Sequence, residues 1–315
     1  MGRFKDDFID ISRNLGVYNA LRLVLLPRII YRLSRKNIYS KAVDSFISDN
    51  LGEIASRYIN QTVSSGTQEI PNIIWVFWWQ GEINMPSVIN ECYQSIIRNA
   101  NGRSVKLITK ENYYKFVKLS DSVMNKFYEK KISFPHFSDI LRTKLLIEYG
   151  GLWIDAAVFV TKPIVIPKGC FFSPKISNEI ADTPHMSQWV IGIMGAIPQM
   201  PLFMYLYDML QSYWQKYDGV FNYLMYDYYI RYAYEHFPWL RKLMDDRDLF
   251  SPDIHSTRYS FNQEVNWERL SMLLNNNTFL SLTYRISYPL TVENGNETYY
   301  YALLKKSNRN DSERN

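Results

Sequence analysis

Three charged side chains near the middle of the chain have types and a spacing that could form a ligand-binding site. Asp139 and Arg142 are three residues apart, so on a helix they would share one face. Asp155 lies in the stretch LWIDAAVFV, whose β-branched and aromatic residues predict a strand. A lone carboxylate bordered by apolar residues is costly to bury without a partner. We therefore expect a functional site at the end of this strand.

Each of these residues also has a purely structural interpretation. Ser138 could cap a helix whose first turn contains Asp139, and Asp139 could form an intrahelical ion pair with Arg142. Asp155 could be a buried hydrogen-bond acceptor. Taken alone, the cap and the ion pair are the simpler explanation, whereas the three charged residues together favour a site.

The elements around these residues predict an α/β protein with a parallel sheet. Residues 73–81 form an apolar run typical of a strand buried on both faces, and residues 86–102 predict a helix. A second strand is predicted over 105–109 and a second helix over 111–118. Strands that alternate with helices form parallel sheets, in which ligands bind beyond the carboxyl ends of the strands.

The helix that carries Asp139 is predicted to end at Gly150-Gly151, and the next strand to cover residues 152–160. Because side chains alternate along a strand, Asp155 and Ala157 would point to the same face.

Composition limits the class of protein. The chain has 315 residues, of which 47% are hydrophobic and 21% charged, too apolar a composition for a disordered protein. Its two cysteines, Cys92 and Cys170, exclude a disulfide framework and a CxxC metal cluster, and they favour a reducing compartment. We expect a globular chain with one large domain or two smaller ones.

Basic charge is concentrated in the first 41 residues. They contain nine Lys or Arg and three Asp, which gives a net charge of +6. The whole chain has a net charge of +5, so the rest of the chain is close to neutral. A neutral body argues against nucleic-acid binding, which needs a basic surface on the folded protein. Apolar residues alternate with arginines over 15–35, which predicts a basic amphipathic helix interrupted at Pro27.

This N-terminal segment has no apolar window long enough to span a bilayer, and its arginines argue against a signal peptide. Two interpretations stay open: the helix lies on an anionic membrane surface, or it packs on the protein with its arginines in water. We predict a helical N-terminal region over 1–66 with a polar linker over 44–69, a main domain over 67–304, and a disordered polar tail over 305–315.

Four segments together resemble glycosyltransferase family 32, and most closely its bacterial capsular polysaccharide synthesis branch. They are IPNIIWVFWWQG (70–81), NECYQSIIRNA (90–100), HFSDILRTKLLIEYGG (136–151) and GLWIDAAVF (151–159). The most specific part is Ser-Asp-x-x-Arg followed by Gly-Gly-x-x-x-Asp. The resemblance implies a GT-A type, Rossmann-like domain over 67–304 and a retaining hexosyltransferase that uses a nucleotide sugar, in most cases UDP-linked.

The resemblance also assigns residues to roles. Trp78 would face the base, and Ser138, Asp139 and Arg142 would bind the sugar hydroxyls and donor phosphates. Asp155 would be the first carboxylate of an Asp-x-Asp motif that binds Mn²⁺ or Mg²⁺. Ala157 stands at the second motif position, and one carboxylate with phosphates is a sparse ligand set for a hard cation. A later acid could compensate, or arginines could bind the diphosphate instead.

Two later residues are weaker candidates. Asp227 lies in an aromatic helix predicted over 221–237, either exposed and paired with Arg231 at i+4 or as a carboxylate beside the acceptor. Arg285 lies in SLTYRIS (281–287), a segment similar to a C-terminal segment of the family, and would contact phosphate.

The sequence therefore predicts a glycosyltransferase, with the divalent cation in doubt. Its partners would be a nucleotide-sugar donor, a lipid-linked saccharide acceptor of capsule or O-antigen synthesis, and the inner face of the bacterial cell membrane. We expect a cytoplasmic, peripheral location. Three alternatives stay open: a sugar-phosphate transferase on the same fold, a catalytically silent relative that binds a nucleotide or glycan, and a membrane-surface scaffold.

Overall fold

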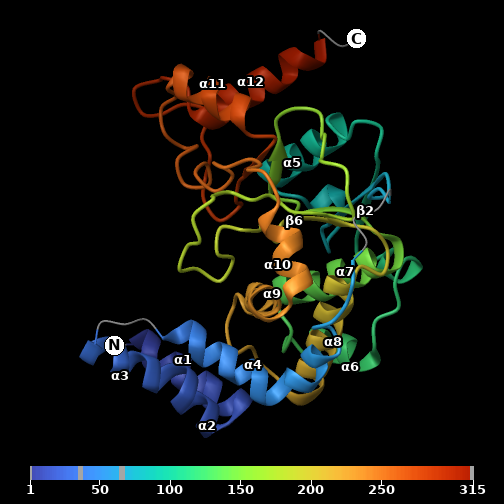
Figure 1. Cartoon of the computed structure of the whole chain (residues 1–315). Helices are drawn as coiled ribbons and strands as arrows, with labels where there is room; N and C mark the ends of the chain where they lie inside the picture. Colours follow the sequence, from blue (N-terminus) through green and yellow to red (C-terminus); the bar gives the residue numbers. More distant parts are fainter. Residues whose placement is uncertain (1, 35–37, 64–67, 313–315) are drawn as a thin grey trace.

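A mixed sheet lies in the middle of the protein and separates two hydrophobic cores (Figure 1). The computed structural model describes residues 2–34, 38–63 and 68–312. In this part of the chain the sheet has five strands in the order β2-β1-β3-β6-β5. Four of them run in the same direction and β6 runs opposite to them. The strands are β1 (Ile73–Phe77), β2 (Ser104–Ile108), β3 (Gly151–Ile154), β5 (Phe171–Phe172) and β6 (Ile193–Ala196). The predicted α/β fold with a mostly parallel sheet is thus confirmed.

Alternation along the central strands divides their side chains between the two cores. In β1, Ile74 and Val76 face one core, whereas Trp75 and Phe77 face the other. Trp153 of β3 joins the core that contains Trp75, and its neighbours in the strand join the opposite one. This pattern explains the continuous apolar run in the sequence, because a strand that is covered on both faces has no polar side.

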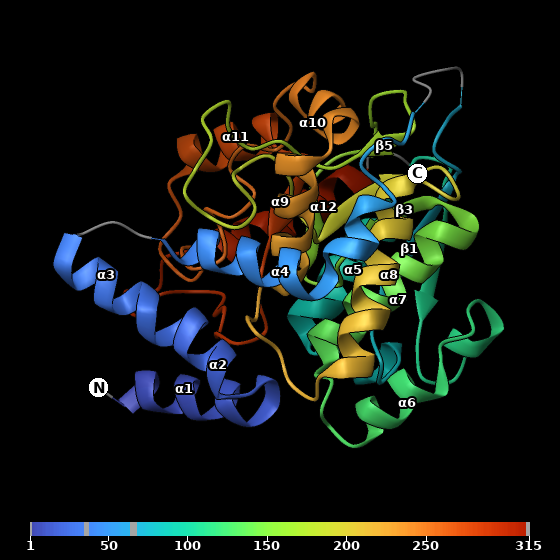
Figure 2. The same ribbon diagram turned by 60° about the horizontal axis from the view of Figure 1, so that its bottom comes forward.

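Helices cover both faces of the sheet. One core lies against α4 (Tyr39–Ser56), α6 (Asp121–Tyr128), α7 (Phe134–Tyr149), α8 (Pro201–Lys216), α9 (Met225–His236) and α10 (Pro238–Asp245). The other lies against α5 (Ser87–Arg98), α11 (Trp267–Asn276), α12 (Tyr299–Ser312) and a small sheet of β4 (Val158–Val160) with β7 (Phe279–Ser281). Figure 2 shows α4, α8 and α9 side by side.

The first helices form an arm at an end of the molecule, in which the chain turns back at the non-helical residue Gly16 (Figure 2). They are α1 (Gly2–Leu15), α2 (Val17–Ala20), a π-helical segment η1 (Leu21–Leu25) and α3 (Leu26–Ser34) (Figures 1 and 2). The predicted interruption at Pro27 is wrong, because Pro27 lies in the first turn of α3, where its missing N–H needs no helical partner. None of the described helices is long and apolar enough to cross a membrane.

The segment between α8 and α9 connects the N-terminal helices with the rest of the protein. Gly219 packs so closely against Asn14 of α1 that a Cβ at Gly219 would lie 2.4 Å from Asn14 Nδ2. Asn222 Nδ2 donates to the hydroxyl of Tyr39 at 2.9 Å, and this hydroxyl donates to Phe221 O at 3.4 Å.

Several predicted boundaries are wrong. The polar linker over 44–69 is largely helix, since α4 continues to Ser56. Residues 64–67 of that linker lie outside the described residues. The helix over 111–118 is only a short 3₁₀ segment, η3 (Tyr113–Lys115), and the tail predicted to be disordered from 305 is helical as part of α12 up to Ser312.

Two corrections concern the site itself. Helix α7 begins at Phe134 after Ser133, so Ser138 is not its cap and Asp139 lies in its second turn. The strand over 152–160 is broken: β3 ends at Ile154, and β4 begins at Val158 in a different sheet. The expected shared face of Asp155 and Ala157 therefore does not exist, because the chain turns at these residues to pair with β7.

Candidate functional site

A cavity of about 410 Å³ lies beyond the carboxyl ends of β1 and β3, where the sequence predicts a ligand. Its walls come from the ends of these two strands, α7, the segment between α8 and α9, and two later segments around 258 and 282–285. The charged and aromatic residues that line it are Phe77, Trp78, Trp79, Phe134, Asp139, Arg142, Trp153, Asp155, Tyr223, Tyr226, Arg258, Tyr259, Tyr284 and Arg285.

Arg142 lies at the centre of the charged cluster. Its side chain is only 3% exposed, and its Nη2 lies 3.0 Å from Asp139 Oδ1 and 3.7 Å from Asp155 Oδ1. The guanidinium lies between the rings of Trp153 and Tyr226, at 5.1 and 5.2 Å from their centroids. It also donates to a main-chain oxygen, that of Ile191. Arg142 is thus held by two carboxylates, two rings and a main-chain oxygen, and only its buried Nε has no hydrogen-bond partner among the described residues.

Asp155 presents its carboxylate to the cavity at the point where β3 ends. Its N–H donates to Gly192 O at 2.8 Å, and its Oδ1 accepts a hydrogen bond from Trp153 Nε1 at 2.7 Å. The side chain is nevertheless 41% exposed, which makes it the most accessible carboxylate of the cluster. Position 192 has no room for a side chain, because a Cβ on Gly192 would lie 2.8 Å from Asp155 Oδ2.

Asp139 is buried and carries a strongly shifted pKa. Burial raises its pKa to about 7, although the charge of Arg142 acts in the opposite direction and Asp155 adds a smaller increase. The pKa of Arg142 is raised, because the neighbouring carboxylates outweigh the effect of its own burial. Shifted pKa values in a cavity are typical of functional sites.

Asp227 is buried in α9, so its predicted exposure and pairing with Arg231 are wrong. Its Oδ1 accepts a hydrogen bond from Trp189 Nε1 at 2.9 Å, whereas Arg231 pairs with Glu235 at 3.0 Å. Burial raises the pKa of Asp227 to about 6, and the hydrogen bond from Trp189 partly lowers it. Asp227 lies directly behind the cavity, since its neighbour Tyr226 forms part of the wall.

The aromatic residues of β1 and its end separate into core and cavity. Trp75 is buried, and its Nε1 donates to Gly150 O at 2.8 Å. Trp79 reaches the cavity but also packs on Phe137, with ring centroids 5.4 Å apart. Trp78 is half-buried and meets Tyr284 edge-on at 5.7 Å. Trp78 is therefore the ring with the most freedom to stack on a ligand.

The other predicted residues lie in the same cavity. Ser138 lines it from α7, and Arg285 lines it from the opposite side. The pKa of Arg285 is raised by its neighbours Tyr223 and Tyr284.

The sequence analysis missed Arg258, Tyr223, Tyr259 and Tyr284. Arg258 Nη2 donates to Ser281 Oγ at 2.9 Å, and its Nε is buried without a hydrogen-bond partner. No motif marks these residues; the one usable signal was SLTYRIS, which contains Tyr284 beside Arg285.

The side chains around Asp155 do not fit the divalent cation that the resemblance implies. Position 157 offers no carboxylate, one oxygen of Asp155 is bonded to Trp153, and the Arg142 guanidinium lies 3.7 Å away. Hard cations prefer several oxygen ligands and are repelled by a guanidinium. Among the described residues, three potential metal ligands come together elsewhere, at Asp44, Glu235 and His236.

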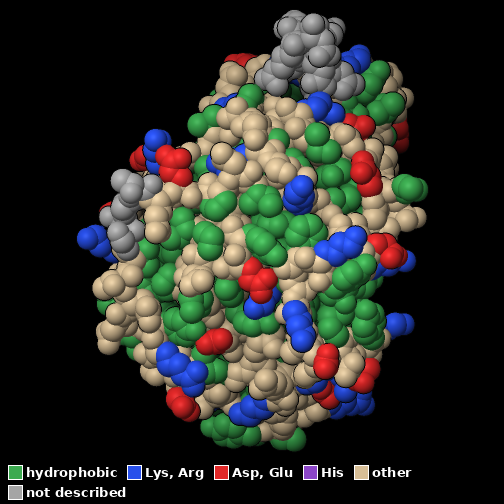
Figure 3. Space-filling model, turned by 90° about the vertical axis from the view of Figure 1, so that its right-hand side faces the viewer, with side chains coloured by type: hydrophobic (Ala, Val, Ile, Leu, Met, Phe, Trp, Pro, Cys, Tyr) green, Lys and Arg blue, Asp and Glu red, His purple; other side chains and the backbone are tan. Residues whose placement is uncertain are grey.

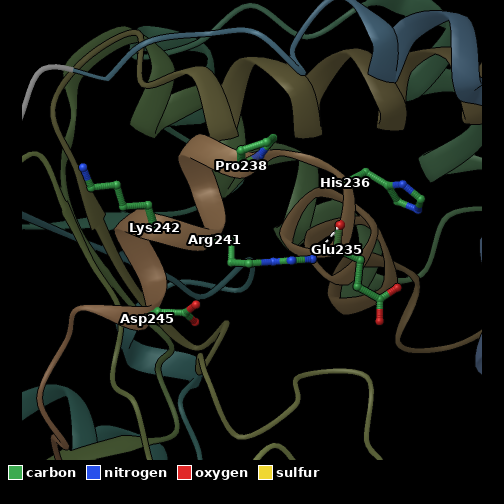
Figure 4. A pocket seen from close by; sticks show the side chains of 6 residues that line it. All are labelled: Glu235, His236, Pro238, Arg241, Lys242 and Asp245. Atoms are coloured by element: carbon green, nitrogen blue, oxygen red, sulfur yellow. Dashed lines mark hydrogen bonds between the residues drawn. The ribbon is translucent and has the colours of Figure 1, made fainter.

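That second group borders a shallower cavity between α9 and α10 (Figure 4). Glu235 and His236 point in different directions there, and Glu235 is already paired with Arg231. His236 Nε2 lies 3.1 Å from Asp44 Oδ1. The Asp155 cavity is the better candidate site, because its charged groups converge on one point.

Comparisons with known proteins agree with part of this description. A family model described as capsular polysaccharide synthesis protein matches residues 28–303. No curated protein sequence matches the chain significantly. The solved structure of "PaToxG Glycosyltransferase" is similar over 67% of this chain and 83% of that chain, with 16% identity and a TM-score of 0.40, which carries no inference about activity.

The family match covers the whole cavity, including β1, α7, Asp155 and Arg285. It confirms the capsular part of the resemblance, whereas membership of glycosyltransferase family 32 and the GT-A type stay predictions. The chain therefore belongs to the capsular polysaccharide synthesis protein family.

Proposed function

We propose that this protein is a hexosyltransferase of the GT-A type that moves a sugar from a nucleotide sugar, UDP-linked, to a saccharide acceptor. One observation carries the proposal. In a cavity at the carboxyl ends of parallel strands, Arg142 lies 3.0 Å from Asp139 and 3.7 Å from Asp155, and an accessible tryptophan lies beside them. A site for a nucleotide sugar needs such a combination of a flat ring, hydroxyl acceptors and fixed charge.

In the proposed reaction the bond from the sugar C1 to the diphosphate oxygen breaks, and a bond from C1 to an acceptor hydroxyl oxygen forms on the same face. The acceptor hydroxyl gives its proton to the leaving diphosphate oxygen, and UDP leaves with the bonding electrons. Trp78 would stack on the uracil, and the exposed carboxylate of Asp155 would accept hydrogen bonds from sugar hydroxyls. Arg142 would hold Asp155 and Asp139 in place, and positive groups around the cavity would stabilise charge on the leaving oxygens.

Asp227 is the proposed acid on the acceptor side. Its pKa of about 6 would allow it to exchange a proton near neutral pH, and the side chain of its neighbour Tyr226 lines the cavity. No covalent intermediate is required.

The experiment measures nucleotide release from UDP-, GDP- and CMP-sugars with a lipid-linked saccharide acceptor. We expect release of UDP from one UDP-sugar, and its loss in Asp155→Asn with little change in melting temperature. As a matched control, Asp218→Asn removes an exposed carboxylate outside the cavity and should keep full activity. Full activity in Asp155→Asn would contradict the proposed role of Asp155.

The same assay separates the alternatives. A sugar-phosphate transferase would release UMP instead of UDP, because the bond between the two phosphates would break. A catalytically silent relative would bind UDP without releasing it from any UDP-sugar. A membrane-surface scaffold would bind no nucleotide at all, and the charged cavity would then have no explanation.

We further propose that the protein docks on the inner face of the bacterial cell membrane, where a lipid-linked acceptor would be reached. Support comes from exposed apolar side chains along α2, η1 and α3, which we call the apolar stripe. Its residues are Val17, Leu21, Leu26, Ile29 and Leu33. Leu33 is 82% exposed, which is unusual for a leucine on a helix that has a buried side.

The π-helical segment keeps this stripe continuous. The stripe residues follow each other at intervals of four, five, three and four, and the interval of five falls at η1, where the wider turn accommodates an extra residue. Ala20 and Leu23, between them, are buried. Arg32 is exposed on α3 between Ile29 and Leu33, and such cations attract anionic headgroups while apolar side chains enter the boundary of the acyl layer.

Vesicle binding tests this arrangement. Full-length protein should bind phosphatidylglycerol vesicles better than phosphatidylcholine vesicles, and more weakly as salt is added. Leu21→Ser with Leu33→Ser should reduce binding about tenfold or more, whereas Leu290→Ser, at a half-exposed leucine outside the arm, should not. Equal binding by all three proteins would mean that the stripe has another partner.

A further inference from the structure

Resting on the proposed function, we infer that Arg258 and Arg285 bind the donor diphosphate directly and take the place of a metal ion. The starting point is the misfit described above: Asp155 has one accessible carboxylate, a nearby guanidinium and no second acid at position 157. Such a set does not attract a divalent cation, yet a leaving diphosphate still needs positive charge.

Both arginines line the cavity that contains Asp155 and Trp78. Among the described residues neither forms an ion pair with a carboxylate, whereas Arg142 is paired with Asp139 and Asp155 and donates to a main-chain oxygen. The buried Nε of Arg258, like that of Arg142, has no acceptor, and a buried donor without a partner is unfavourable. An anion in the cavity would supply the acceptor.

The fold links the two arginines through one tyrosine. The Tyr288 hydroxyl donates to Arg258 O at 2.7 Å and accepts from the N–H of Thr283 at 3.2 Å. Thr283 Oγ1 in turn accepts from the N–H of Arg285 at 3.2 Å. The two segments are therefore fixed to each other near the cavity. This is the arrangement needed for two groups that bind neighbouring phosphates.

Arginine also suits this role chemically. Its planar guanidinium binds two phosphate oxygens at once and stays charged at all physiological pH values. Tyr223 and Tyr284 are hydrogen-bonding neighbours of Arg285, and among the described residues no carboxylate pairs with its charge. Ser281 holds Arg258 at Nη2, which leaves its other nitrogens available.

The test measures equilibrium binding of UDP, uridine and pyrophosphate to the full-length protein by calorimetry, in EDTA and in Mn²⁺ or Mg²⁺. We expect UDP affinity to be the same within about threefold with and without the metal. Arg258→Gln and Arg285→Gln should each weaken UDP and pyrophosphate binding about tenfold or more and leave uridine binding unchanged. Arg258→Lys should restore part of the loss.

Lys242→Gln, outside the cavity on α10, is the matched control for loss of one positive charge. Melting temperatures check folding, and the exposed Arg285 provides a test even if variants of the more buried Arg258 do not fold. UDP binding that disappears in EDTA and returns with Mn²⁺ would overturn the inference. Arginine-dependent binding of pyrophosphate without binding of UDP or uridine would support the anion site and contradict the nucleotide-sugar function. Absence of all binding would overturn both.

Discussion

The raised pKa of Asp139 predicts that the protein loses stability as the pH rises. The unfolded carboxyl group releases its proton near pH 3.8, whereas the folded one keeps it up to about pH 7. Between these values the unfolded state binds fewer protons, so the free energy of unfolding falls by at most about 1.4 kcal/mol per pH unit. From about pH 5 to about pH 8 the loss due to Asp139 amounts to roughly 2 to 3 kcal/mol. Above the folded pKa the effect levels off.

Substitution of Asp139 by Asn tests this value. Asparagine keeps the shape and can still accept a hydrogen bond from Arg142, but it does not titrate. Urea unfolding of both proteins at a series of pH values should show that stability falls less steeply in Asp139→Asn, with a difference of roughly 2 to 3 kcal/mol over the same range. His136 and His255, whose pKa values are lowered, add an opposite slope to both proteins and cancel in the comparison.

Asp218→Asn is the control for this experiment. Lys126 and Lys131 lower the pKa of Asp218, so it stays ionised throughout the range and its removal should leave the slope unchanged. If wild type and Asp139→Asn had the same slope, Asp139 would titrate as an ordinary carboxyl group. Burial would then not raise the pKa of Asp139.

Three smaller perturbations test other parts of the site. Gly192→Ala should displace the carboxylate of Asp155 and reduce turnover by tenfold or more without unfolding the protein, since the new Cβ would lie 2.8 Å from Oδ2; an unchanged kcat would contradict this. Gly151→Ala should destabilise by about 2 to 5 kcal/mol in urea unfolding, because φ is +94° and the Cβ would lie 2.3 Å from a neighbouring side chain. Trp189→Phe should cost about 1.5 to 3 kcal/mol at neutral pH and raise the pKa of Asp227 further, which NMR titration of that carboxyl group would detect.

The charged cluster could be predicted because its geometry is local. An interval of three residues on α7 is enough to bring Asp139 and Arg142 together. The position of Asp155 directly after a parallel strand places it at the carboxyl end of the sheet, beside Arg142. The buried strands could be predicted for the same reason, because an apolar run such as 73–77 records the environment of each residue directly.

The missed features depend on contacts between distant segments. The break after Asp155 arises because β4 pairs with β7, more than a hundred residues later, and local propensity favours one unbroken strand. Arg258 reaches the cavity through bonds to Ser281 and Tyr288, which no periodicity indicates. The polar linker predicted over 44–69 is wrong in its first part because the buried face of α4 packs on α8 and α9, so tertiary contacts outweigh its polar composition.

The charges on one face of the molecule are consistent with the nearly neutral net charge of the chain after residue 41. Figure 3 shows Lys and Arg side chains interspersed with Asp and Glu, without a broad area of one sign on that face. The net charge of +6 in the first 41 residues is instead carried by the N-terminal helices and the residues after them.

The close packing of the N-terminal arm against the segment between α8 and α9 limits how the gene for such a protein could be recombined. Asn14 touches Gly219, Tyr39 is bonded to Asn222, and the next residue, Tyr223, already forms part of the cavity wall. The arm is therefore not a module that can be exchanged between relatives by a crossover near residue 60. A chimaera should keep its activity only if both segments come from the same parent.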